Sequence, residues 1–204
     1  NSFRYDSLGT IETVEKIQLK DVIEFYRKLH SPSNMVLSVF GDFSTDATLK
    51  MIKNKFSALS GPEIAVQKRT DEPPQQKIEQ TIYMPKEQAV VMVGFQSPTI
   101  YDKDKYVVAL ARSILGSSLS GRIFVKIRDE LGQAYTLGGE YSPGVDGGYT
   151  YFYVNTTDEN VEKVKEVLLT QIAELETKAV TDQELSDSKS YMKGKFKMGL
   201  DSNA

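Results

Sequence analysis

The stretch that decides the fold, Ile114–Ser142, reads ILGSSLSGRIFVKIRDELGQAYTLGGEYS. It predicts a helix that changes into a strand. The helical part carries apolar residues at helical spacing, namely Ile123, Phe124, Ile127 and Leu131. Gly132 ends this predicted helix. The strand part carries β-type residues, namely Tyr135, Leu137 and Tyr141.

Two polar residues flank the change from helix to strand. Arg128 lies near the end of the predicted helix, and Tyr135 lies near the start of the predicted strand. Such a corner can bring a guanidinium and a phenol to the same side of the chain. The sequence therefore predicts a polar site formed by these two side chains.

The residues upstream of this stretch predict a helix, a strand and a second helix, followed by a linker. Apolar residues at helical spacing predict helices over residues 20–30 and 44–56. Met35–Phe40 is almost wholly apolar and is interpreted as a buried strand. Residues 58–76 combine glycine, prolines and charged residues and predict the linker. We expect residues 1–57 to form one part of the chain and residues 77–204 another.

The part after the linker predicts an α+β domain. Its strands are expected as two hairpins, one from residues 77–84 and 88–96 and one from residues 134–142 and 149–155. The run Val90–Val93 is continuously apolar, which is typical of a central strand covered on both faces. Helices are expected at residues 102–115 and 158–178 and after the capping box Thr181–Glu184. The predicted fold class is α+β, with two layers, a mostly antiparallel or mixed sheet, and helices packed on one face.

Alternating tyrosines mark the last predicted strand. Tyr149, Tyr151 and Tyr153 share one face of it. We interpret them as packing residues rather than as a surface on which nucleic-acid bases stack.

Composition excludes several classes of function. The net charge is −3, and no basic run occurs, so neither nucleic acid nor an anionic membrane is expected as a partner. No apolar stretch reaches the length of a membrane span, and the N-terminus has no signal-peptide core, so we expect a soluble protein. The sequence does not identify its compartment, which for a bacterial-type protein is cytoplasmic or periplasmic.

The metal ligands of a zinc enzyme are largely missing from the sequence. There is no cysteine, and His30 is the one histidine. A catalytic zinc normally takes three protein ligands, so no metal site is expected in this chain. His30 closes the predicted helix 20–30 and is interpreted as a capping or packing residue.

Several motifs together resemble the pitrilysin and insulinase-like zinc metallopeptidases, in particular the branch of mitochondrial processing peptidase and its bacterial relatives. The series comprises Leu115-Gly116, Ser120-Gly121-Arg122-Ile123-Phe124, Ile127-Arg128-Asp129-Glu130 and Ala134-Tyr135. Further similar positions are Pro32–Leu37 with Gly41-Asp42, Asp146-Gly147-Gly148 and Thr181–Leu185. Gly121 and Gln133 depart from the residues most common in that family.

The resemblance implies a role for the chain in proteolysis. In such families two homologous halves close around an unfolded peptide, and the first half carries a His-x-x-Glu-His zinc motif, which is absent here. By this resemblance, residues 1–57 are the tail of the zinc-bearing half and residues 77–204 the start of the second half. Arg128 and Tyr135 match residues that contact the substrate backbone near the scissile bond. Zinc is implied for the parent or a partner subunit. By the same resemblance, this chain contributes no catalytic residue and is expected to be inactive alone, as one part of a hydrolase.

Two alternatives remain open from the sequence. The chain can belong to a partner or scaffold subunit that lacks peptidase activity, because some members of such families lack the metal motif. Arg128 can instead form an ion pair with Asp129 or Glu130 while Tyr135 is an ordinary strand residue. We also expect that Met35–Phe40 can dock against the sheet of residues 77–155, within one chain or in a domain-swapped dimer.

Overall fold

The computed structural model describes residues 6–61, 63, 74–117, 119–132, 134 and 136–200. The chain divides into two compact units, whose described residues fall within 6–63 and 74–200. Each unit is described by itself.

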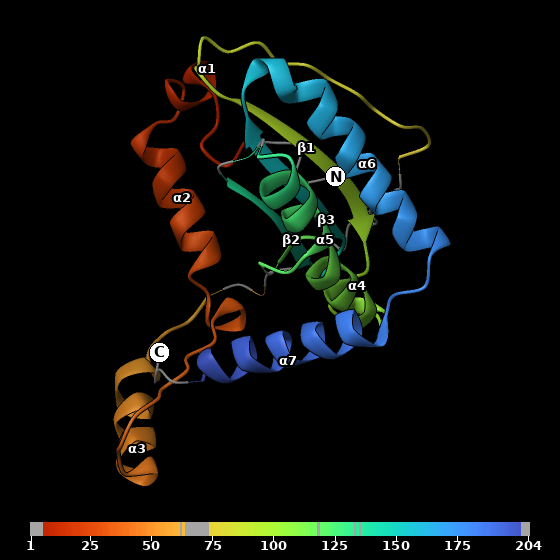
Figure 1. The fold of residues 1–204 in the computed structure, drawn as a ribbon. Coiled ribbons are helices and arrows are strands. Elements are labelled where there is room, and N and C mark those ends of the chain that lie inside the picture. Colours follow the sequence, from red (N-terminus) through yellow and green to blue (C-terminus); the bar gives the residue numbers. More distant parts are fainter. Residues whose placement is uncertain are drawn as a thin grey trace. The chain divides into compact units, whose positions relative to one another are not determined.

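The second unit is built on a three-stranded antiparallel sheet. Its strands are β1 (Ala89–Ser97), β2 (Thr136–Pro143) and β3 (Gly148–Thr156), in the order β1-β3-β2 (Figure 1). The register pairs Val91 with Val154 across β1 and β3, and Leu137 with Val154 across β2 and β3. β3 is therefore the central strand.

Helices pack on one face of this sheet. They are α4 (Lys105–Arg112), the π-helical segment η3 (Ser113–Ser117), α5 (Arg122–Phe124), the π-helical segment η4 (Val125–Glu130) and α6 (Val161–Thr177), whereas α7 (Asp182–Met198) packs against η3 and α4. A short 3-10 turn, Asp158–Asn160, precedes α6. The second unit thus has the predicted α+β class, with helices on one face of an antiparallel sheet.

The hydrophobic core lies between the sheet and these helices. Its fully buried side chains include Val154 from β3, Ile123 and Ile127 from the α5–η4 helix, and Val164 and Leu168 from α6. Phe152 completes the sheet side of the core at 3% exposure. Its ring lies against Gly116 and Gly139, where a Cβ atom would come within 3.0 Å and 2.7 Å of it. Glycine at these two positions makes room for the ring.

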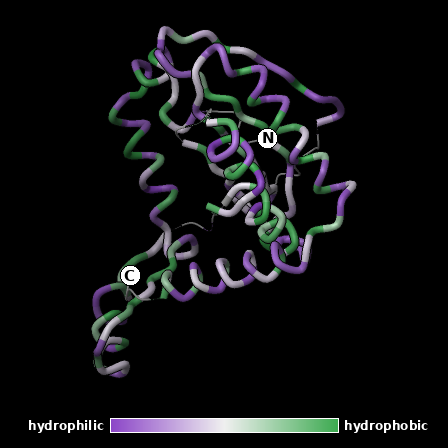
Figure 2. Tube along the Cα trace, viewed as in Figure 1, coloured by the Kyte–Doolittle hydropathy of each residue, from purple (hydrophilic) through white to green (hydrophobic). Residues whose placement is uncertain are grey.

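The first unit consists of helices without a described strand. It contains α1 (Ile11–Val14), α2 (Leu19–Leu29), a 3-10 turn (Pro32–Asn34) and α3 (Thr45–Phe56). Hydrophobic and hydrophilic residues alternate along its helices (Figure 2). His30 caps α2, as predicted: its ring stacks on Tyr26 at 3.9 Å between centroids, and its backbone N–H donates to the Tyr26 carbonyl.

The predicted strand at Met35–Phe40 is wrong. The segment is assigned no secondary structure, and Val36 and Phe40 are 94% and 73% exposed. An apolar run indicates a strand only if a second strand completes its hydrogen-bond ladder, and the described sheet consists of β1, β2 and β3. Met35–Phe40 is therefore not among the strands of that sheet, and its docking stays a prediction.

The first predicted hairpin is also wrong. Residues 77–84 form no strand, and Ile78 and Ile82 are largely exposed. β1 pairs with β3 instead, so it is an outer strand of the described sheet rather than a central one. Val90 and Met92 are 59% and 60% exposed, because helices cover one face of β1 alone. Continuous apolar residues do not reveal which strand is the partner.

The remaining elements agree with prediction to within a few residues. The second hairpin forms as β2 and β3, and helices α2, α3, α6 and α7 occupy the predicted segments. The capping box is present at α7, where the Thr181 hydroxyl accepts from the Glu184 N–H and the Glu184 carboxylate accepts from the Thr181 N–H.

Candidate functional site

The candidate site is the corner at which the α5–η4 helix ends and the chain turns towards β2. Ile123 and Ile127 lie one helical turn apart, and both are fully buried. They hold one side of the helix in the core. Phe124 and Arg128 are each one position further along, so they lie together on the adjacent, more accessible side. Helical periodicity therefore places Arg128 at the surface.

Arg128 is exposed and rests on an aromatic ring. Its guanidinium carbon lies 4.8 Å from the centroid of the Phe124 ring, a cation–π contact. The predicted alternative, an ion pair with Asp129 or Glu130, is not formed in the described part of the chain; the Glu130 carboxylate binds Lys126 instead. The guanidinium donors of Arg128 thus face solvent while Phe124 limits where they lie.

The backbone at the corner is irregular. Arg128 lies in η4, a π-helical segment, and such segments are frequent at functional sites. The Arg128 carbonyl accepts from both Leu131 N–H and Gly132 N–H, which closes the helix. Gly132 has φ +63°, a conformation that favours glycine. This residue turns the chain out of the helix.

Tyr135, the second predicted site residue, lies outside the described residues. The geometry of the corner is therefore that of Arg128 and its described neighbours. The described strand β2 begins at the next residue, Thr136. The expectation that Arg128 and Tyr135 act together stays a prediction.

A second arginine of the same stretch holds the helix in place. Arg122 forms a bidentate pair with Glu184 of α7, with Nε donating to Oε1 at 2.5 Å and Nη2 donating to Oε2 at 3.0 Å. The guanidinium of Arg122, together with hydrogen bonds from Thr181, lowers the pKa of Glu184 to about 2, and the carboxylate raises the pKa of Arg122. Arg122 is therefore a structural residue that connects α5 to the start of α7.

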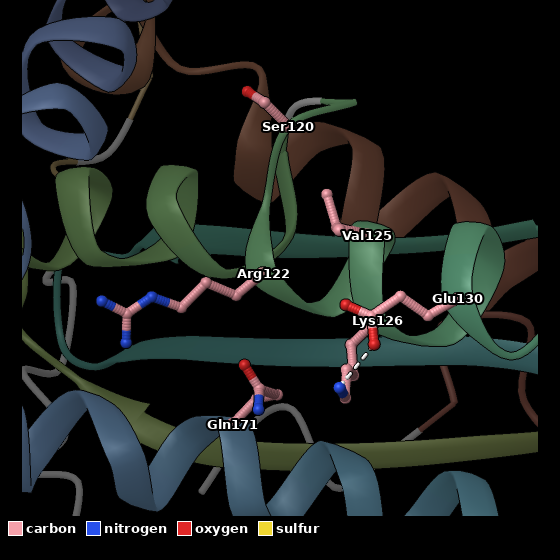
Figure 3. A pocket seen from close by; sticks show the side chains of 6 residues that line it. All are labelled: Ser120, Arg122, Val125, Lys126, Glu130 and Gln171. Carbon is pink, nitrogen blue, oxygen red and sulfur yellow. Dashed lines mark hydrogen bonds and ion pairs between the residues drawn. The ribbon is translucent and has the colours of Figure 1, made fainter.

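A shallow depression lies beside this pair. It has a volume of about 350 Å³ and is lined by Ser120, Arg122, Val125, Lys126, Glu130 and Gln171. Figure 3 shows the Arg122 side chain extending away from Lys126 and Glu130, which bind each other. The charged groups of the depression are thus paired with protein groups.

A third arginine stabilises the edge of the sheet. Arg112 Nη1 donates to the carbonyl of Gly139 at 3.0 Å and lies 3.6 Å from a carboxylate oxygen of Glu140. This contact joins α4 to β2 beside the core ring of Phe152.

Sequence reasoning missed two of these contacts. Phe124 and Arg128 are four residues apart in a helix, so their contact could have been predicted from spacing. Arg122 and Glu184 are 62 positions apart, and no local pattern predicts their pairing.

The described residues contain no cluster suited to a metal ion. No group of three or more His, Cys, Asp or Glu side chains comes together in this part of the chain. The side chains gathered at the corner are a guanidinium and a phenyl ring, which are not zinc ligands. Among the described helices, none is long and apolar enough to cross a membrane.

Comparison with known proteins agrees with this α+β fold. A family model described as "Peptidase M16 inactive domain" matches residues 16–192. The chain belongs to this family, which confirms the resemblance drawn from the motifs.

Two relatives illustrate the range of names in this family. The uncharacterized zinc protease YmxG of Bacillus subtilis is 27% identical over 99% of the chain and 49% of the relative. A Helicobacter pylori protein named non-peptidase homolog YmxG is 29% identical over 92% of the chain and 44% of the relative. The chain thus spans about half the length of the relatives it matches.

A solved structure shows the same fold. The peptidase M16 inactive domain from Pseudomonas fluorescens has a TM-score of 0.85 and 23% identity, covering 93% of this chain and 46% of that one. At this identity the likeness supports the fold alone.

Proposed function

We propose that this chain is the non-metal-binding part of a zinc endopeptidase, and that Arg128 holds the backbone of an unfolded peptide near the scissile bond. The observation that carries the proposal is the state of Arg128. It is exposed, it contacts Phe124, and it forms no ion pair in the described part of the chain. A guanidinium in this state is available to a ligand, whereas Arg122 is engaged by Glu184.

The chemistry of a guanidinium suits this role. Its N–H groups donate to carbonyl oxygens and favour the negative charge that develops on a peptide oxygen during hydrolysis. Removing one such donor costs about 3–4 kcal/mol of transition-state stabilisation in well-studied proteases. Tyr135, by its phenol, is proposed as a second donor from the same corner.

The zinc of such an enzyme is proposed to belong to another part of the parent protein or to a partner subunit. This chain has one histidine and no cysteine, and its described residues form no metal-binding cluster, so its residues do not fit a catalytic zinc. No catalytic step through zinc is therefore assigned to residues of this chain.

The first unit supports the proposed division into halves. Its described residues include no buried hydrophobic side chain. Val22, Tyr26 and Leu49 are apolar residues of its helices, yet each is 48–58% exposed. Helices stabilised in a globular protein normally bury an apolar face. We propose that residues 1–57 complete a preceding, zinc-bearing half, that residues 58–76 link the halves, and that residues 77–204 begin the second half.

A scaffold or partner subunit is the second candidate function. The relative named non-peptidase homolog YmxG, at 29% identity, favours it. The sequence that precedes residue 1 in the parent distinguishes the candidates. A His-x-x-Glu-His motif there supports the enzyme, and its absence from both the parent and any partner subunit supports the scaffold.

A domain-swapped dimer of this chain is a further part of the proposal. Met35–Phe40 is uncharged, exposed and unpaired, and β1 is an uncharged outer strand of the described sheet. Exposed apolar strand edges pair readily with other chains. We propose that the segment of one copy adds to β1 of another copy.

The proposal that zinc binding and catalysis belong to another part of the parent or to a partner subunit is tested with the purified chain. We expect no peptidase activity and no stoichiometric zinc by metal analysis after dialysis. One tightly bound zinc per chain, or cleavage of an unfolded peptide by the chain alone, would contradict the proposal.

A further inference from the structure

One face of the sheet is left uncovered by the helices of the second unit. Side chains alternate along strands, and the register places these residues opposite the core: Val90, Met92, Gly94 and Gln96 of β1, Tyr149, Tyr151, Tyr153 and Asn155 of β3, and Thr136, Gly138, Glu140 and Ser142 of β2. We call this set the tyrosine face. The residues between them, including Val91, Phe152 and Val154, form the core on the other side.

Three tyrosines form a continuous row along the middle of this face. The rings of Tyr149 and Tyr151 stack with centroids 6.1 Å apart, and those of Tyr151 and Tyr153 are 6.2 Å apart. The ring of Tyr153 lies over Gly138, where a Cβ atom would come within 3.0 Å of it. Tyr149 is 38% exposed. The rings are therefore ordered by one another and by the sheet while part of their surface stays accessible.

The charge of the tyrosine face restricts its partner. It carries no lysine or arginine, and its one charged residue, Glu140, lies 3.6 Å from Arg112. Phosphate-bearing partners such as nucleic acids or anionic lipids require basic residues. The tyrosines are flanked by Met92 and Val90, which are about three-fifths exposed, and by the neutral Gln96 and Asn155. The matching partner is neutral and partly apolar.

The spacing of the rings matches an extended polypeptide. A strand rises about 3.3 Å per residue, so alternate side chains repeat every ~6.6 Å. The ring separations of 6.1 Å and 6.2 Å are close to this repeat. Alternate side chains of an extended peptide can therefore contact successive rings.

We propose that the tyrosine face binds an extended, uncharged segment of the polypeptide substrate. This inference rests on the proposed function, because it adds a second binding surface for the same peptide. The rigid aromatic row contributes apolar contact at a low cost in side-chain entropy.

The test measures binding to the purified chain by fluorescence anisotropy. The probe is a fluorescein-labelled, uncharged peptide in which glycine and serine separate single leucine and phenylalanine residues. We expect Tyr151→Ser to weaken binding about tenfold, as for a central aromatic contact. Tyr149→Ser, at the more exposed end of the row, should weaken it several-fold and serves if the first variant fails to fold. Tyr101→Ser is the matched control, since Tyr101 is 74% exposed and lies outside the sheet.

Three results would overturn the inference. The first is that the wild-type chain does not bind the probe. The second is that the Tyr149→Ser and Tyr151→Ser variants bind the probe as tightly as the Tyr101→Ser control. The third is that the full-length parent binds the probe at least tenfold more weakly than this chain does. The last result would mean that the parent covers the tyrosine face with its own residues. The measurement involves neither zinc nor cleavage, so a failure of this inference is distinguishable from a failure of Arg128 to support hydrolysis.

Discussion

The ion pair between Arg122 and Glu184 makes the stability of the second unit depend on pH. The substitution Glu184→Gln removes the charge but keeps an acceptor for the Thr181 N–H, because glutamine also serves in a capping box. A comparison of the wild-type chain with Glu184→Gln therefore measures the charged contact with Arg122 separately from the helix cap.

The lowered pKa sets the size of the effect. A fall from 4.5 to about 2 corresponds to at most ~3.4 kcal/mol, at about 1.36 kcal/mol per pKa unit. Because 28% of the Glu184 side chain is exposed, solvent screens part of this electrostatic stabilisation. We therefore expect Glu184→Gln to lower the free energy of unfolding by about 2 kcal/mol at pH 7. The pKa is lower in the folded state, so the stabilisation is present above pH 4.5 and is lost as the pH falls towards 2. At pH 3.5 the loss should be smaller by about 1 kcal/mol.

Urea unfolding followed by circular dichroism measures this difference at pH 7 and pH 3.5. A double-mutant cycle with Arg122→Gln assigns the coupling to the pair. Glu166→Gln is the control, because Glu166 pairs with Lys163 at the surface of α6, and we expect no measurable loss there. An equal loss for Glu184→Gln at both pH values, or no coupling with Arg122, would refute the reasoning.

Two further predictions concern packing and the exposed segment. Gly139→Ala places a methyl group within 2.7 Å of the Phe152 ring and should lower the free energy of unfolding by about 1–3 kcal/mol, as measured by urea unfolding. Gly194→Ala in α7 is the control, because the space around Gly194 is open and alanine favours a helix, so we expect no destabilisation. Equal effects of the two substitutions would contradict the described packing of Gly139 against Phe152. Val36→Lys should leave monomer stability unchanged, since Val36 is 94% exposed, but should abolish any dimer seen by analytical ultracentrifugation; a dimer that persists would rule out the strand exchange.

Local patterns were sufficient to predict the helices and the second hairpin. The capping box at Thr181 and the apolar spacing of α6 act over a few residues, and the structure shows both. β2 and β3 are joined by a short turn, so their pairing is also local.

Pairing between distant segments could not be predicted from the same patterns. β1 lies about 50 residues before β3, yet these two strands pair. Met35–Phe40 and residues 77–84 have the composition of strands but form none, because a strand depends on a partner that its own residues do not specify.

The candidate site also combines a local feature, which sequence spacing explains, with a contact between distant residues, which it does not. The exposed position of Arg128 follows from its helical spacing relative to the buried Ile123 and Ile127, and its place near the end of the helix was predicted from the sequence. The Arg122–Glu184 pair depends on how α7 packs against α5, which sequence spacing does not reveal. The joint action of Arg128 and Tyr135 stays a prediction.

The most direct test of the proposed role is the effect of Arg128→Ala in the full-length parent. Steady-state cleavage of an unfolded peptide gives kcat/KM, and metal analysis of the same samples gives the zinc content. We expect kcat/KM to fall about 10²- to 10³-fold with zinc content unchanged, as for the loss of one transition-state donor. Asp129→Asn, an exposed neighbour in η4, should leave both quantities unchanged. An unchanged kcat/KM in Arg128→Ala, or a loss of zinc equal to the loss of activity, would contradict the proposed role of Arg128.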